Sequence, residues 1–166
     1  MKPIIILAAF ITLFLFACRS KDKEVQTTPP AVSEHYTWVA SMDDSTGNLK
    51  MVQANPIPDD SLNKEYILEL LNNRFNIEKQ QLLSFDFVKQ SGDTIWIKIP
   101  DATYLTQQSG STGADEHLGT IVYNLTELPG VKWVHLDFEE GDHAAPGLFA
   151  RDSTSTGITV VSKPDK

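Results

Sequence analysis

The side chains best suited to binding a metal ion are four histidines and one acid-rich run. No metal-ligand spacing relates His35, His117, His135 and His143, and the chain contains no HExxH or CxxC pattern. The run from Asp137 to His143 carries carboxylates, but it lacks the alternating Asp/Asn positions and the terminal Glu of an EF-hand loop. We therefore expect a solvated strand end at this run, with no metal and no cofactor.

One segment, Gly110-Ser111-Thr112-Gly113, is a candidate for anion binding or nucleophilic chemistry, and it precedes a predicted helix. Backbone N–H groups at the start of a helix can bind an anion. The segment lacks the lysine of a P-loop, and the chain has no GxSxG nucleophile turn. A flexible lead-in to the helix is the expectation, and no catalytic residue is predicted. A Ser, His and Asp set that assembles only in space is the alternative that the sequence leaves open.

Composition limits the class of protein. A chain of 166 residues predicts one domain with tails. The net charge of −8 repels the phosphate backbone, so a nucleic-acid partner is not expected. The single cysteine allows neither an intrachain disulfide nor a cysteine-based zinc site.

That cysteine, Cys18, has a different expected chemistry. An apolar run of about 14 residues from Ile4 to Ala17 has the length of a signal-peptide core and is shorter than the ~20 residues of a membrane span. The sequence Leu15-Phe16-Ala17-Cys18 resembles a bacterial lipobox, which is cut before the cysteine. We expect Cys18 to carry lipid and to anchor the chain in a membrane. An ordinary secretory peptide and a short N-terminal anchor helix are the alternatives.

The expected organisation follows from this anchor. Residues 1–17 form the signal peptide, and residues 18–34 form the lipidated Cys18 with a disordered tether rich in charge and proline. Residues 35–142 form the folded domain, and residues 143–166 form a flexible C-terminal tail. The expected location is the bacterial cell envelope on the extracytoplasmic side, at the outer membrane if the cell is Gram-negative.

The folded part alternates between strand and helix patterns. In chain order the sequence predicts strands 35–41 and 49–54, a helix 62–75, strands 82–90 and 94–99, a helix that starts at a capping box from Thr112 to Asp115 and ends near 128, and a strand 131–138. Strands 35–41 and 49–54 are predicted to form one hairpin, and strands 82–90 and 94–99 a second one. The order predicts an α+β fold in which two amphipathic helices pack on one face of a mostly antiparallel, twisted sheet.

Strand alternation divides the side chains between two faces. The set expected to face the helices is apolar: Val39, Leu83, Phe85, Phe87, Ile95, Ile97, Ile99, Val134, Leu136 and Phe138. All three tryptophans fall on the other face, which predicts a binding surface made of Tyr36, Trp38, Trp96, Trp133 and His135. The C-terminal tail, a second copy of the chain or a partner are the candidates for covering it.

Three segments carry a resemblance to a known family. They are the strand from Ile95 to Pro100, the loop and helix start from Gly110 to Glu116, and above all the run from Ile121 to Val134, YNLTELPGVKW at its centre. They resemble the GerMN domain of sporulation and germination lipoproteins, over about two-thirds of the chain. The resemblance implies a small non-enzymatic α+β module of the bacterial envelope, related in fold to ring-building motifs that pack side by side. It does not imply sporulation, because the sporulation members carry tandem copies.

The leading hypothesis is therefore a lipid-anchored, non-enzymatic interaction or scaffold module that binds an envelope protein or itself. The alternative is a glycan- or ligand-binding lipoprotein, in which Trp38, Trp96 and Trp133 stack on sugar rings. An envelope hydrolase is a third candidate, for which no motif is present.

Overall fold

The computed structural model describes residues 34–77 and 80–151, which belong to one unit, Val32–Lys166. The expected signal peptide, Cys18 and nearly all of the tether lie outside the described residues, as do residues 152–166. In chain order the elements are β1 (His35–Met42), β2 (Leu49–Ile57), α1 (Lys64–Arg74), β3 (Asn76–Ile77), β4 (Gln80–Gln81), β5 (Asp86–Ser91), β6 (Thr94–Lys98), a π-helical turn η1 (Tyr104–Gln108), α2 (Gly110–Leu125), β7 (Trp133–Asp137) and β8 (Gly147–Phe149). The fold is α+β, as the sequence predicts.

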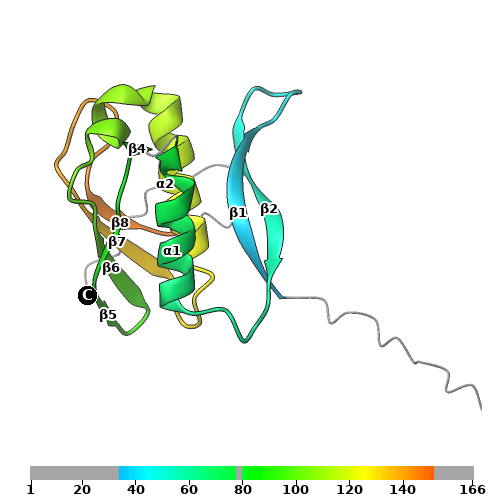
Figure 1. Ribbon diagram of the computed structural model, residues 1–166. Helices are drawn as coiled ribbons and strands as arrows, with labels where there is room; N and C mark the ends of the chain where they lie inside the picture. Colours follow the sequence, from blue (N-terminus) through cyan, green and yellow to red (C-terminus); the bar gives the residue numbers. More distant parts are fainter. Residues whose placement is uncertain (1–33, 78–79, 152–166) are drawn as a thin grey trace, which may run out of the picture. The chain divides into compact units, whose positions relative to one another are not determined.

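The larger sheet has the strand order β5-β6-β7-β8, and both helices lie on one of its faces (Figure 1). β6 and β7 are parallel, because the chain crosses over between them through η1 and α2, and the other two pairs are antiparallel. Ile95 and Ile97 of β6 pair with Val134 and Leu136 of β7, and all four side chains are fully buried. This is the apolar face that the sequence predicts for these two strands.

The hairpin of β1 and β2 is a separate two-stranded sheet, so the prediction of a single sheet is wrong on this point. The hairpin packs against α2 on the side away from the larger sheet (Figure 1). Every residue from Leu118 to Leu125 is consequently buried, as in a helix that is covered all round. Strand alternation did not reveal this arrangement, because it shows which side chains share a face and not which sheet a strand joins.

Both helices begin at residues other than those predicted. α1 begins after Asn63, whose side-chain oxygen accepts a hydrogen bond of 2.9 Å from the backbone N–H of Tyr66. α2 begins at Gly110, so Thr112 and Asp115 lie inside the helix instead of capping it. The segment between β6 and α2 contains η1, which the sequence does not predict.

The domain does not end at Asp142, and residues 143–151 are not part of a flexible tail. β8 pairs antiparallel with β7, opposite Val134, His135 and Leu136. Phe149 is only 1% exposed and belongs to the hydrophobic core. Three residues are too few for a period-two pattern to predict a strand.

Two residues depart from the predicted apolar face, Val39, which lies on β1 in the separate hairpin, and Phe87. The register of β5 shifts between Phe87 and Lys89, where a β-bulge interrupts the pairing with β6. Phe87 is 37% exposed, and the Nζ atom of Lys64 lies 3.9 Å from its ring centroid. The alternation did not predict the bulge, because Phe87 continues the pattern of Leu83 and Phe85.

Candidate binding surface

The outer face of the larger sheet carries aromatic and basic side chains from four strands. Trp96 on β6 pairs with His135 on β7, and their ring centroids lie 6.2 Å apart with the planes inclined by 25°. Lys89 on β5 pairs with Trp96, and its Nζ atom lies 4.7 Å from the Trp96 ring centroid. Trp133 on β7 and Leu148 on β8 share this face by register. We call Lys89, Trp96, Trp133, His135 and Leu148 the outer-face cluster.

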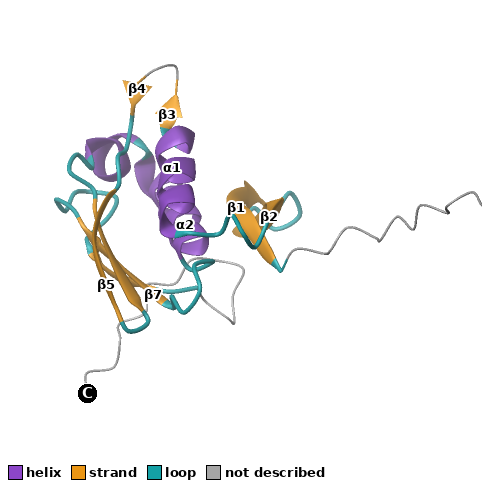
Figure 2. Cartoon of the chain, turned by 60° about the horizontal axis from the view of Figure 1, so that its bottom comes forward, coloured by secondary structure: helices purple, strands orange, loops and turns teal. Residues whose placement is uncertain are grey.

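Strand alternation places this cluster opposite the core. Trp96 lies between the buried Ile95 and Ile97, and His135 lies between Val134 and Leu136. Trp96, Trp133, His135 and Leu148 are half-buried. No helix covers this face among the residues that the structure describes (Figure 2).

One polar atom of the cluster is unsatisfied. The Nδ1 atom of His135 is buried and has no hydrogen-bond partner in residues 34–77 and 80–151. A buried ring nitrogen without a partner costs free energy, and such atoms are rare in folded proteins. The cluster therefore combines the apolar area of its aromatic side chains, the ammonium group of Lys89 and a ring nitrogen of His135 that has no hydrogen-bond partner in the described residues.

Trp38 and Tyr36 do not belong to this surface, so the prediction that all three tryptophans share one sheet face is wrong. Both lie on β1, in the separate hairpin. Trp38 faces α2, and its ring lies 5.2 Å from that of Tyr123 in an edge-to-face contact. Its backbone N–H donates to Asn124 Oδ1 at 3.0 Å, and its carbonyl accepts from Asn124 Nδ2 at 2.9 Å. Trp38 therefore helps to hold the hairpin on the helix.

A buried carboxylate completes this attachment. Glu127, whose side chain is 8% exposed, accepts a hydrogen bond of 2.7 Å from Trp38 Nε1. The same carboxylate contacts Nδ1 of His35 at 3.0 Å and the guanidinium of Arg151. Arg151 also donates to the Tyr123 carbonyl. The sequence shows no sign of this cluster, because the residues that contact Glu127 lie up to 92 positions from it along the chain.

The electrostatics of Glu127 follow from these contacts. Burial alone would raise the pKa of this carboxyl. Hydrogen bonds from Arg151, Trp38 and His35 favour the charged form more strongly, and the pKa lies below its ordinary value of 4.5. Glu127 is therefore an ionised structural group at neutral pH.

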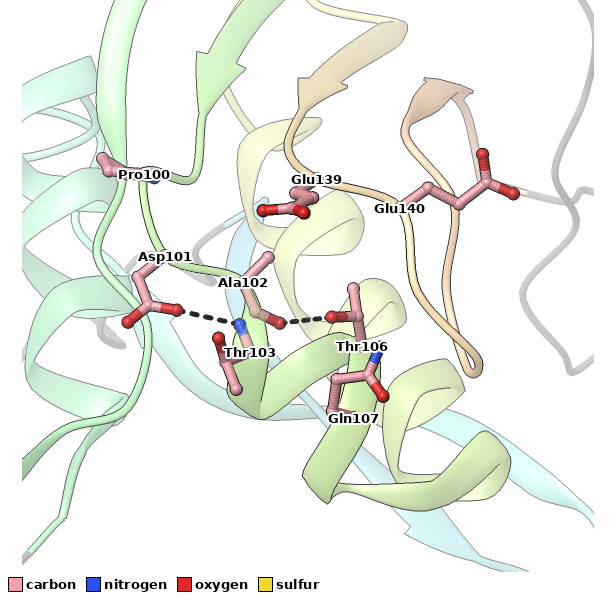
Figure 3. A pocket seen from close by; sticks show the side chains of 8 residues that line it. All are labelled: Pro100, Asp101, Ala102, Thr103, Thr106, Gln107, Glu139 and Glu140. Carbon is pink, nitrogen blue, oxygen red and sulfur yellow. Dashed lines mark hydrogen bonds between the residues drawn. The ribbon is translucent and has the colours of Figure 1, made fainter.

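A small acidic hollow lies where β6 and β7 end, with a volume of about 160 Å³ (Figure 3). The carboxylates of Asp101, Glu139 and Glu140 line it. The backbone N–H of Thr103 donates to Asp101 Oδ1 at 3.0 Å and lowers the pKa of that carboxyl. No group of three or more His, Cys, Asp or Glu side chains in the described ranges is arranged to hold a metal ion.

The remaining histidines lie apart from the outer-face cluster. His117 packs between Tyr104 and Phe75, with ring centroids 5.3 and 5.2 Å away, and burial lowers its pKa. His143 lies near Ser111, with 3.3 Å between Nδ1 and Oγ on an exposed surface. Within the described ranges, the structure thus does not bring the four histidines together, and the segment from Gly110 to Gly113 meets only His143, at Ser111.

Comparison with protein-family models, with curated proteins and with solved structures finds no match to this chain. None of the helices within the described ranges has the length and hydropathy needed to cross a membrane.

Proposed function

We propose that this chain is a non-enzymatic interaction module of GerMN type, held at a bacterial envelope membrane by lipid on Cys18, and that it binds an envelope protein through the outer-face cluster. The observation that carries the proposal is the cluster itself: two tryptophans, a histidine and a leucine gathered on the sheet face opposite both helices. Aromatic side chains of this kind dominate the energy of protein interfaces.

The chemistry of the cluster favours a protein partner over a glycan. A sugar ring stacks on an open aromatic face, but the Lys89 ammonium already lies over the Trp96 ring. Trp38, the third tryptophan of the glycan hypothesis, is engaged with Glu127. A protein surface can instead supply a carboxylate for Lys89 and a hydrogen-bonding group near His135, so it suits the mixed character of the cluster.

The test compares association with stability in single variants. Trp96→Ala and Trp133→Ala should each weaken association at least tenfold, the loss typical of an interface hot spot. Quantitative pull-down from envelope extract measures association with a partner protein, and size-exclusion chromatography detects self-association. Met42→Ala, which truncates an exposed residue of the hairpin, is the matched control and should leave association unchanged.

The same variants separate binding from folding. Urea denaturation should show nearly unchanged midpoints for Trp96→Ala and Trp133→Ala, because their side chains lie outside the core. Unfolding comparable to that of a core variant, without any loss of association, would contradict the proposed surface. A glycan that binds the wild type but not Trp96→Ala would favour the alternative function.

A further inference from the structure

One face of α1 borders a hollow that the outer-face cluster does not involve. Tyr66, Leu70 and Arg74 are spaced four residues apart and therefore share a face of the helix. Across from them, β1 contributes Trp38 and Val39 and β2 contributes Ala54. The hollow between helix and hairpin has a volume of about 360 Å³, within the 300–1,000 Å³ range of small-molecule pockets.

Among the described residues, Arg74 is the only charged residue that lines this hollow. Its guanidinium makes no hydrogen bond or ion pair with any residue in the part of the chain that the structure describes. Two other cations near the hairpin are already paired, Arg151 with Glu127 and Lys50 with Asp43. A planar guanidinium with all its donors available matches a carboxylate, which it can bind through two parallel hydrogen bonds.

Two neighbouring hollows also reach Arg74, and their charge decides which one an anion would enter. The hollow on the outer side of α1 contains Glu69, and the hollow at the end of α1 contains Glu116. Either carboxylate would repel an anion. The described residues that line the hollow beside the hairpin include no acidic side chain. Of the three hollows, this one therefore pairs Arg74 with a lining free of carboxylates, in which Thr37 and Asn55 are polar and most other residues are apolar.

We propose that this hollow binds a small monocarboxylate with an apolar body. The carboxylate pairs with Arg74, and the apolar body lies between Leu70 on the helix side and Trp38 and Val39 on the hairpin side. The site is distinct from the outer-face cluster, so this inference is independent of the proposed function.

The test uses 4-phenylbutanoate as the probe and the full chain in lipid nanodiscs, with empty nanodiscs as the blank in equilibrium dialysis. Arg74→Gln should weaken binding by about ten- to a hundredfold, the effect of removing a charged hydrogen-bonding partner. Ala54→Trp, which fills the hollow from an exposed position, should weaken it comparably. Lys98→Gln is the matched control and should bind as the wild type does, because it removes an exposed cation from β6, a strand that does not line the hollow.

Two further ligands separate the carboxylate site from simpler explanations. 4-Phenylbutanol, which keeps the apolar body without the charge, should bind more weakly and should be insensitive to Arg74→Gln. Inorganic phosphate should not compete. Three outcomes would each overturn the proposal. The acid and the alcohol could bind equally well, phosphate could compete fully, or the folded Arg74→Gln variant could bind 4-phenylbutanoate as the wild type does. Urea midpoints of the variants establish that they are folded.

Discussion

At the scale of single residues, the buried carboxylate of Glu127 connects segments that lie far apart in the chain. It joins β1, through Trp38 and His35, to the segment after β8, through Arg151. A buried carboxylate is stabilising only while its donors are in place, and its donors lose their partner if it is changed.

We expect Glu127→Gln to destabilise the fold by about 1–3 kcal/mol, the cost of leaving a partly buried charged donor without its partner. Urea denaturation at pH 7 measures the loss. Glu139→Gln, at an exposed position, is the matched control and should change the free energy of unfolding by less than about 0.5 kcal/mol.

The pH dependence of this difference has a definite sign. The pKa of Glu127 is lower in the folded state than its ordinary value of 4.5, so the folded state favours the charged form. Its contribution is fully present above that value and is lost as the pH falls through the folded-state pKa. The gap in stability between wild type and Glu127→Gln should therefore narrow from pH 5 to pH 3. A constant gap would show that the contacts of Glu127 do not depend on its charge.

Substitutions at Gly130 measure the free-energy cost of backbone conformation separately from the cost of packing. Its φ of +78° lies in the left-handed region, and a Cβ placed there would meet no atom within 4 Å. Any cost of a side chain at this position therefore comes from the backbone. Gly130→Val should cost about 1–3 kcal/mol in urea denaturation. Gly130→Asn should cost clearly less, because asparagine tolerates this region, and equal losses would indicate a different cause.

At the scale of elements, β8 is a strand that the sequence did not predict. Phe149 is fully buried, whereas its neighbour Leu148 faces the outer side of the sheet. Phe149→Ala should cost about 3–5 kcal/mol, the range for a large aromatic removed from a core. Leu148→Ala, measured by the same denaturation experiment, should cost much less. Similar small losses for both would mean that β8 does not contribute to the core.

The elements show where sequence patterns were informative. The alternation of Ile95 and Ile97 with Trp96 predicted the faces of β6 correctly, because both sides of that strand are determined by one buried sheet. The same pattern placed Trp38 wrongly, because the hairpin buries its side chains against α2 instead of forming part of the larger sheet. The start of α2 was also missed, because Gly110 has a positive φ and leads directly into the helix without a side-chain cap.

The residues of the outer-face cluster were also predicted only in part. Trp96, Trp133 and His135 were identified from alternation, and the structure places them on one face. Lys89 and Leu148 were not, because a bulge shifts the first and the second lies in a strand too short to recognise. Contacts between distant segments, such as those of Glu127, leave no periodic signal in the sequence.

At the scale of the whole molecule, the proposed membrane anchor is the most direct prediction. We expect Cys18 to be acylated in cells, because the apolar run before it is too short to span a membrane and ends at a small residue followed by cysteine. Metabolic labelling with a fatty-acid probe should mark the wild type and fail to mark Cys18→Ser. Equal labelling of the two would exclude this anchor.

The paired hydrogen bonds between Trp38 and Asn124 have a consequence for how the molecule opens. They join residues 86 positions apart, whereas the hairpin's own pairing is local. An isolated two-stranded hairpin is at best marginally stable in water, so β1 and β2 should detach and lose their structure together while the larger sheet stays intact. Native-state hydrogen exchange should then give one shared, lower opening free energy for the amides of β1 and β2, and a higher one for those of β6 and β7. The segment next to the proposed tether would thus be the first to yield when the chain is pulled from its anchored end.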